Sequence, residues 1–327
     1  MKEKILNALE NNRGKFVSGE QLAEDFKVTR AAVWKAIQSL RKEGHKIKAI
    51  TNKGYRLERF SDVLTKEGIT ANLKSGTKIS EVLCFDTINS TNTYAKNLAL
   101  SGAKRGTLIA ANHQTQGRGR SGHSFESPAG TGLYMTLILR PEIEMSKFQM
   151  ITIADAVAVC KAIEDLSGGI IEGLKIKWVN DVFLRGKKIT GILTEAITNF
   201  ENGEIESVIT GIGINVSTKK FQGNLSETAG AIFEHDEILF GRDELCARVA
   251  DYIMDMAENL NDPEMIKSYR ERSMLTGKNI TYMKNNESHS AKVEGIDDLG
   301  GLEIINDKGE REILRSGEVF MVREHEK

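Results

Sequence analysis

The N-terminal residues alternate apolar and polar positions in a pattern that predicts three short helices followed by a small hairpin. Ser18, with Gln21 three residues later, has the spacing of a capping box and marks the start of the second helix. Thr29 can cap the third helix, which runs to Leu40 with a polar, basic side outward. The apolar positions that define the first and third helices are Ile5, Leu6, Leu9, Val33, Ile37 and Leu40, with Trp34 beside the last three. We therefore expect a winged helix-turn-helix at residues 1–62.

The middle of the chain alternates strand-like and helix-like segments. Helices are expected at Thr91–Leu100, capped by Ser90, at about Ile151–Leu166, and at Asp243–Leu260. Strands are expected at Val82–Phe85, Thr107–Ala111, Leu133–Leu139, Lys175–Leu184, Ile189–Thr198 and Ser207–Val216. This order predicts a mixed α/β domain at residues 65–262, built on one sheet with helices largely on one side.

From about Gly277 onward, short strand-like segments recur with turn residues between them, such as Asn306-Asp307-Lys308-Gly309. This pattern predicts a small β-barrel at residues 270–327. The predicted fold class of the whole chain is therefore α+β, with three parts.

The composition is typical of a folded protein and indicates the cellular compartment in which it works. The 327 residues are enough for about two ordinary domains, and 40% are hydrophobic and 28% charged. The cysteines Cys84, Cys160 and Cys246 are far apart, which fits a reducing compartment. A run of about 18 apolar residues does not occur in the sequence. We therefore expect a cytoplasmic protein without a membrane partner.

Charge is unevenly distributed along the chain. Residues 1–60 contain 14 Lys or Arg and 7 Asp or Glu, a balance of +7, whereas the whole chain carries −1. A basic winged helix favours DNA as partner because phosphate contacts come mostly from Lys and Arg. The candidate DNA-binding residues are Thr29, Arg30, Lys35, Gln38 and Lys53. A winged helix that binds another protein is the alternative.

A glycine-rich stretch, Gly117-Arg118-Gly119-Arg120-Ser121-Gly122, follows one predicted strand. It matches the G-x-G-x-x-G pattern of dinucleotide sites, but another strand follows instead of the helix that such sites require. We interpret it as a mobile loop whose two arginines can bind a carboxylate or phosphate. A solvated basic loop is the alternative.

A second candidate group lies at Lys177-Trp178-Val179-Asn180-Asp181 and the lysines that follow. If Arg185 and Gly186 form a two-residue turn, Phe183 pairs with Lys188, and Asp181 lies diagonally on the same face of the sheet. A carboxylate and an ammonium then share one side, although an exposed surface pair is the alternative. The 6 histidines lack zinc-ligand spacing, so no metal site is predicted.

Taken together, these motifs resemble the family of bifunctional biotin–protein ligases and biotin-operon repressors. The matching segments, in the family's order, are Ser90-Thr91-Asn92, Gln114, Gly117 to Arg120 with Gly122, Ser127-Pro128, Gly130, Gly132-Leu133-Tyr134, Lys177-Trp178, Asn180-Asp181, Lys188, Gly191-Ile192-Leu193 and Gly211 to Asn215. The resemblance covers nearly the whole chain, and the order and spacing of the motifs are highly specific.

The resemblance implies a class II synthetase-like central domain, a C-terminal SH3-like barrel and a two-step reaction with ATP, Mg²⁺ and biotin. Biotin and ATP form biotinyl-5′-adenylate, and biotin then passes to a lysine of the biotin carboxyl carrier protein of acetyl-CoA carboxylase or another biotin-dependent carboxylase. It also implies an adenylate-bound homodimer that represses the biotin operator. A non-enzymatic ligand-sensing repressor and a lipoate–protein ligase are the alternatives.

The resemblance also implies roles for single residues. It implies catalytic roles for Lys188, Arg118 and Asp181. It implies biotin contacts by Ser90, Thr91, Asn92, Gln114, Arg118, Gly119, Arg120, Lys188 and Gly191, and nucleotide contacts by Arg120, Lys177, Asn215 and Arg315. The chain departs from the family at Ser121, where many members have arginine, at Phe125, where tryptophan is usual, and at Val179, where proline is typical.

Overall fold

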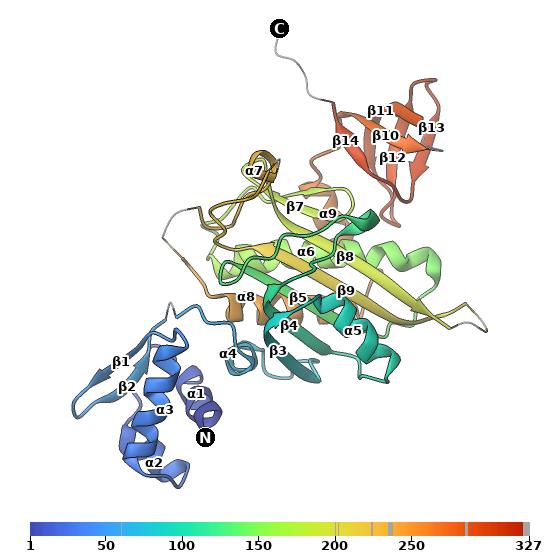
Figure 1. Cartoon of the computed structure of the whole chain (residues 1–327). Coiled ribbons are helices and arrows are strands. Elements are labelled where there is room, and N and C mark those ends of the chain that lie inside the picture. Colours follow the sequence, from blue (N-terminus) through green and yellow to red (C-terminus); the bar gives the residue numbers. More distant parts are fainter. Residues whose placement is uncertain are drawn as a thin grey trace.

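The structure is a computed structural model, in which three parts follow one another along the chain (Figure 1). It describes residues 1–59, 61–199, 201, 203–223, 225–234, 238–284 and 287–322. A three-helix unit with a hairpin comes first, a large mixed sheet flanked by helices is central, and a smaller sheet comes last. Within the described residues, no helix is both long enough and apolar enough to cross a membrane.

The N-terminal unit is the predicted winged helix-turn-helix. It consists of α1 (Lys2–Glu10), α2 (Gly19–Asp25), α3 (Arg30–Lys42) and the antiparallel strands β1 (Ile47–Ile50) and β2 (Gly54–Leu57). Ser18 caps α2 and Thr29 caps α3, each by accepting backbone N–H bonds at the helix start. The Gln21 side chain instead donates to Asp25. This unit has its own apolar core, separate from that of the rest of the chain.

The central sheet has seven strands in the order β3-β4-β5-β9-β8-β7-β6, with only the β3–β4 pair parallel. Its strands are β3 (Glu81–Ile88), β4 (Thr107–Gln114), β5 (Gly132–Leu139), β6 (Lys175–Lys177), β7 (Asp181–Leu184), β8 (Lys187–Thr198) and β9 (Ile205–Asn215). The single strand expected at Lys175–Leu184 is wrong, because Trp178, Val179 and Asn180 turn the chain back and β6 pairs with β7.

Helices cover the two faces of this sheet unequally, as predicted. The helices are α4 (Lys66–Asn72), α5 (Thr91–Leu100), α6 (Phe148–Leu166), α7 (Leu225–Thr228), α8 (Arg242–Met256) and α9 (Pro263–Arg272). The large core packs α6, α8 and α9 against one face. A small cluster that includes Ala95 and Ala99 packs α5 against the other face. The start of α5 is thereby fixed over the sheet, where the chain's polar pocket lies.

The C-terminal part is an antiparallel sheet in the order β13-β12-β11-β10-β14. Its strands are β10 (Asn279–Lys284), β11 (Glu287–Ile296), β12 (Leu302–Asn306), β13 (Arg311–Leu314) and β14 (Val319–Met321). The predicted closed barrel is not confirmed, because no ladder joins the edge strands β13 and β14 among the described C-terminal residues. The Trp178 indole donates to the Gly300 carbonyl at 2.8 Å, and the two parts share one apolar core.

The contact between the winged helix and the central domain differs from this shared apolar core, because it includes several charged side chains. Arg13 Nη2 lies 2.6 Å from Glu10 Oε2 and 2.5 Å from Asp243 Oδ2. Arg242 Nε lies 3.0 Å from Asp62 Oδ2, and Arg242 is only 3% exposed. Burial raises the pKa of Glu10 to about 7 and also raises the pKa of Asp243, while Arg13 lowers both. We call these five residues the junction cluster.

Candidate active site

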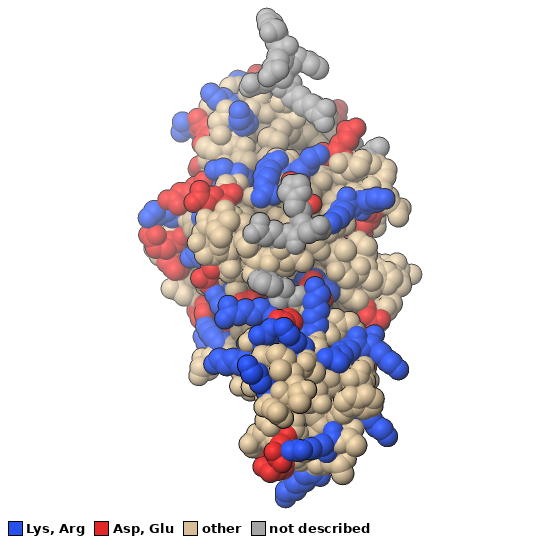
Figure 2. All heavy atoms as spheres, turned by 90° about the vertical axis from the view of Figure 1, so that its left-hand side faces the viewer, with Lys and Arg blue, Asp and Glu red and all other residues tan. Residues whose placement is uncertain are grey.

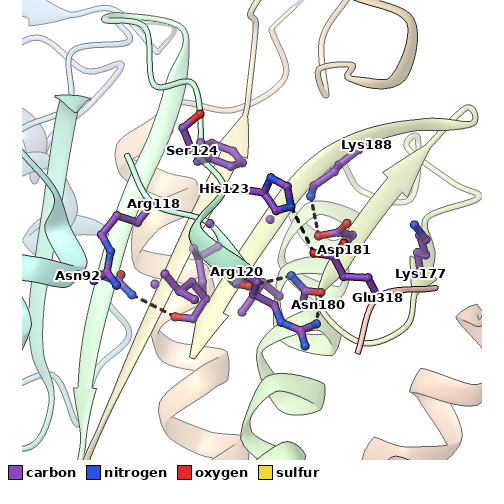
Figure 3. A pocket seen from close by; sticks show the side chains of 18 of the residues that line it. Asn92, Arg118, Arg120, His123, Ser124, Lys177, Asn180, Asp181, Lys188 and Glu318 are labelled. Carbon is purple, nitrogen blue, oxygen red and sulfur yellow. Dashed lines mark hydrogen bonds and ion pairs between the residues drawn. The ribbon is translucent and has the colours of Figure 1, made fainter. Parts of the chain in front are cut away.

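A polar pocket of about 320 Å³ lies over the central sheet, between the start of α5, the glycine-rich loop and β14 (Figure 3). Its lining comes from segments that are far apart in the sequence. The lining residues are Ser90, Thr91, Asn92, Gln114, Arg118 to Arg120, His123 to Phe125, Lys177, Trp178, Asn180, Asp181, Lys188, Gly191 to Leu193, Gly211 to Gly213, Leu225 and Gly317 to Phe320. The C-terminal sheet therefore closes one side of a pocket built on the central sheet.

One end of the pocket is a network of hydrogen bonds among buried or half-buried polar side chains. The Thr91 backbone N–H donates to Gln114 Oε1 at 2.8 Å, and Gln114 Nε2 donates to Ser127 Oγ at 2.9 Å. Thr136 Oγ1 donates to Asn92 Oδ1 at 2.7 Å. Since these groups are largely fixed by one another, they present a preformed set of donors and acceptors to a polar ligand group.

The floor of the pocket is formed by glycines on neighbouring strands. Gly191 of β8 pairs with Gly213 of β9, and Gly211 lies two residues earlier. A Cβ atom at Gly211 would lie 1.7 Å from Asn92 Oδ1, and one at Gly213 would lie 2.5 Å from the Phe125 ring. The floor therefore lets a side chain or a flat ligand lie directly on the sheet, and here the Phe125 ring occupies part of it.

Four Lys or Arg residues line the pocket (Figure 3), and three of them contact an acidic or amide side chain. Arg118 lies 3.2 Å from both carboxylate oxygens of Glu195, and Arg120 Nη1 donates to Asn180 Oδ1 at 2.9 Å. Lys188 Nζ lies 2.7 Å from Asp181 Oδ1. We call Arg118, Arg120 and Lys188 the pocket cations.

Two further contacts connect the pocket to the C-terminal sheet. His123 Nε2, on the glycine-rich loop, lies 3.4 Å from Glu318 Oε1. Lys177 Nζ lies 5.5 Å from the centre of the Phe320 ring, a cation–π distance. Partial burial lowers the pKa of Lys177, and the nearby Asp181 carboxylate opposes this shift.

The structure brings together most of the residues singled out in the sequence. The pocket is lined by all the candidate catalytic and biotin-binding residues, and by Lys177. The predicted turn is confirmed, since Phe183 pairs with Lys188. Asn215 and Arg315 are not in the lining: Asn215 is buried and donates to the Gly230 carbonyl, and Arg315 pairs with Asp297. Their nucleotide roles stay predictions.

Sequence reasoning missed Glu195, Asn180 as a partner of Arg120, and Glu318. Glu195 shares the strand β8 with Lys188 and Gly191, and it is the only acidic residue of that strand, which was the available signal. Glu318 belongs to a distant part of the chain, so no local pattern points to it. Ser121 is exposed with φ 52°, and the Trp178–Val179 peptide bond is cis; nothing in the structure explains why these two positions depart from the family.

The candidate DNA-binding residues lie on one end of the molecule. Arg30, Lys35 and Lys53 are exposed, Gln38 is half-buried, and Thr29 caps α3. Arg30 Nη2 lies 2.5 Å from Glu20 Oε1 on α2. Figure 2 shows many Lys and Arg side chains gathered over the lower half of the face drawn, which includes the N-terminal unit.

Fold and pocket together define a class of protein in which a helix-turn-helix unit is joined to a ligand-binding α/β domain with a cationic pocket. Comparison with known families agrees with this division. Residues 2–56 match the HTH domain, residues 84–215 the biotin/lipoate A/B protein ligase family, and residues 276–322 the biotin protein ligase C terminal domain.

Full-length relatives narrow the class further. The chain is 32% identical to the bifunctional ligase/repressor BirA of Bacillus subtilis (strain 168), over 96% of each chain. It is 29% identical to the BirA protein of Escherichia coli (strain K12), over 75% of this chain and 72% of that one. The biotin protein ligase from Aquifex aeolicus in complex with biotin and ATP has the same fold, with a TM-score of 0.63 and 24% identity over 75% of this chain and all of that one. The chain belongs to the family of bifunctional ligase/repressor proteins.

Proposed function

We propose that this protein is an ATP-dependent biotin–protein ligase and a biotin-responsive transcriptional repressor. In the first step a carboxylate oxygen of biotin attacks the α-phosphorus of ATP, and pyrophosphate leaves. In the second step the amine of an acceptor lysine attacks the acyl carbon, loses a proton and displaces AMP. The full-length BirA relatives, named as ligase and repressor, support both activities.

The observation that carries the enzymatic proposal is the convergence of the three pocket cations. Two anions about 4 Å apart repel each other by roughly 4 kcal/mol at an effective dielectric constant near 20, which corresponds to about a thousandfold in rate. Arg118, Arg120 and Lys188 reach the pocket from two different segments and supply positive charge there. Positive charge so placed lowers the barrier to joining a carboxylate and a phosphate.

We assign biotin's ureido end to the neutral hydrogen-bond network and its carboxylate to the pocket cations. Thr91, Asn92 and Gln114 offer both donors and acceptors, as a ureido group requires. Lys188 and Arg118 then meet the carboxylate and phosphate, with Asp181 beside Lys188. The adenylate extends toward Lys177 and β14, and Asn215 and Arg315 contact it only after a change in arrangement.

We propose that the glycine-rich loop closes over the ligand and protects the intermediate from water. The intermediate is a mixed anhydride, which water hydrolyses, so excluding water preserves it. Arg118 and Arg120 lie on this loop, and their guanidinium groups contact the side chains of Glu195 and Asn180. An anionic ligand that replaces these partners draws the loop over itself.

Further parts of the proposal rest on the resemblance. Mg²⁺ would accompany the triphosphate and neutralise part of its charge. In the pocket lining Asp181 and Glu318 carry carboxylates, but no group of three potential metal ligands occurs among the described residues, so ATP would supply most of the ligands. The acceptor is a biotin carboxyl carrier protein, and the repressor is an adenylate-bound homodimer in the cytoplasm. We place the domains at 1–62, 65–262 and 270–327, the central one class II synthetase-like and the last an SH3-like barrel.

Exchange of radioactive pyrophosphate into ATP tests the enzymatic proposal. The full chain is assayed with biotin, with lipoate and with neither acid. Exchange that depends on biotin is expected. Preference for lipoate would indicate the related ligase activity, and no exchange above background from folded protein would indicate a sensor without enzymatic activity.

The repressor proposal predicts a salt-dependent DNA affinity that increases with biotin and ATP. If Lys35 contacts a phosphate, Lys35→Ala should reduce the slope of log affinity against log salt by about 1. The measurement is a salt titration of wild type and variant on the same duplex. Affinity that is indifferent to both ligands would contradict the coupling of ligation to repression.

A further inference from the structure

The helix α3 carries an exposed tryptophan that neither the core nor the ligase pocket uses. Trp34 is 54% exposed, whereas its neighbours Val33, Ala36 and Ile37 are buried. Within described residues 1–59, Met1 and Trp34 are the large apolar side chains with more than a third of their surface exposed. The sequence placed Trp34 beside the apolar face of α3, and the structure leaves it outside the N-terminal core.

The surroundings of Trp34 are polar and basic. Arg30 lies one turn before it and Lys35 directly after it, and both are exposed. The 13 residues of α3 include four basic residues and no acidic one, and Lys53 is exposed between β1 and β2. An apolar ring among cations suits a ligand that combines negative charge with apolar groups in a groove. Duplex DNA has both features, because the thymine methyl group lies in the major groove between the phosphate backbones.

We propose that Trp34 contacts bases in operator DNA by packing on the 5-methyl group of a thymine. This inference rests on the proposed repressor function and assigns to Trp34 a part in the repressor's preference for particular DNA sequences. The second helix of a helix-turn-helix enters the major groove with its N-terminal part toward the bases, and Trp34 is the fifth residue of α3. Lys35 and Arg30 contribute charge, while Trp34 contributes a preference that salt does not screen.

The test removes the methyl group from the DNA and the ring from the protein. Duplexes enriched from a random library by the full chain, with biotin, ATP and Mg²⁺, serve as probes, and each thymine is replaced singly by uracil, which lacks only that methyl. Burial of one methyl group predicts that wild type loses about fourfold in affinity at one thymine position or more. Trp34→Ala should bind the thymine probe more weakly and show no further loss with uracil there.

Two variants provide controls. Trp34→Phe keeps an apolar ring and should retain part of the thymine preference, whereas Lys35→Ala should weaken both probes alike and keep their ratio. Biotin-dependent pyrophosphate exchange and far-UV circular dichroism of Trp34→Ala should equal those of wild type.

Two results would overturn the inference alone: an unchanged thymine-to-uracil ratio in Trp34→Ala, or a loss confined to dimer formation in sedimentation, which would make Trp34 a contact between copies. If wild type enriches no sequence from the library, operator binding itself is contradicted and the inference fails with it.

Discussion

The junction cluster and the pocket cations both contain arginines paired with polar side chains, but the two sets differ in burial and in the number of their partners. At the junction, Arg242 is 3% exposed and donates to Asp62, to Asn112 Oδ1 and to the Gly132 carbonyl. In the pocket, the Arg118 side chain is 45% exposed and is held by Glu195 alone among the described side chains. A buried cation with several partners cannot leave without exposing unpaired charge, whereas a half-exposed cation with one partner can exchange it for a ligand.

This difference in burial indicates that the junction residues stabilise the structure, whereas the pocket cations act on the ligand. The junction arginines hold the winged helix against the ligase domain, and their removal should cost stability. The pocket cations can bind an anionic ligand, and their removal should lower activity while leaving the fold intact. Each prediction below tests one side of this contrast.

The largest effect is expected for Lys188→Ala. Loss of one pocket cation leaves part of the carboxylate–phosphate repulsion unopposed, so biotin-dependent pyrophosphate exchange should fall about 100- to 1000-fold. Far-UV circular dichroism and the unfolding midpoint should not change. Lys187→Ala is the matched control, because Lys187 lies outside the pocket lining and donates to the Glu227 carbonyl. Normal exchange by Lys188→Ala would remove Lys188 from its assigned role.

Arg242→Ala should show the opposite profile. It leaves Asp62 without its charged partner, and breaking a buried pair of this kind costs roughly 3–5 kcal/mol of unfolding free energy. Arg248→Ala, on the same helix but with a half-exposed side chain paired to Asp165, should cost less than about 1 kcal/mol. Urea unfolding followed by circular dichroism measures both. Equal losses in the two variants would refute the distinction between buried and exposed pairs.

The raised pKa of Glu10 predicts how the free energy of unfolding depends on pH. Burial raises the pKa of Glu10 from its ordinary value of 4.5 to about 7, so the folded state binds the extra proton between these pH values. Its contribution to stability is therefore fully present below about pH 4.5 and is lost as pH rises through about 7. Relative to Glu10→Gln, wild type should lose on the order of 3 kcal/mol over this range. The check is a set of urea midpoints at several pH values, with exposed Glu3→Gln as control; parallel curves for wild type and Glu10→Gln would contradict it.

The smallest effect is expected for Glu195→Gln. The neutral amide competes less strongly than a carboxylate for Arg118, so an anionic ligand should displace it more easily. Since exposed pairs contribute up to about 1 kcal/mol, the KM for biotin in the exchange reaction should fall by about two- to fivefold. Glu206→Gln, at an exposed pair with Arg140, should leave KM unchanged. A rise in KM would show that Glu195 supports the binding arrangement and does not compete with the ligand.

Local patterns predicted the parts of this structure that depend on local forces. Thr91–Leu100 is helical with Ser90 as its cap, and Lys188 meets Asp181 across the expected turn. Contacts between distant segments were not predictable in this way. Glu195 contacts Arg118, 77 residues away in the sequence, and His123 contacts Glu318, which directly precedes β14 of the C-terminal sheet. Barrel closure likewise depends on pairing of edge strands, which short apolar segments do not specify.

A crystal structure of the full chain with biotin and a non-hydrolysable ATP analogue tests the central claim most directly. The account predicts that Arg118 leaves Glu195, and that the guanidinium and ammonium groups of Arg118, Arg120 and Lys188 lie within hydrogen-bond distance of the ligands' carboxylate and phosphate oxygens. Ligands bound in the pocket while these three groups keep their present protein partners or face solvent would contradict it.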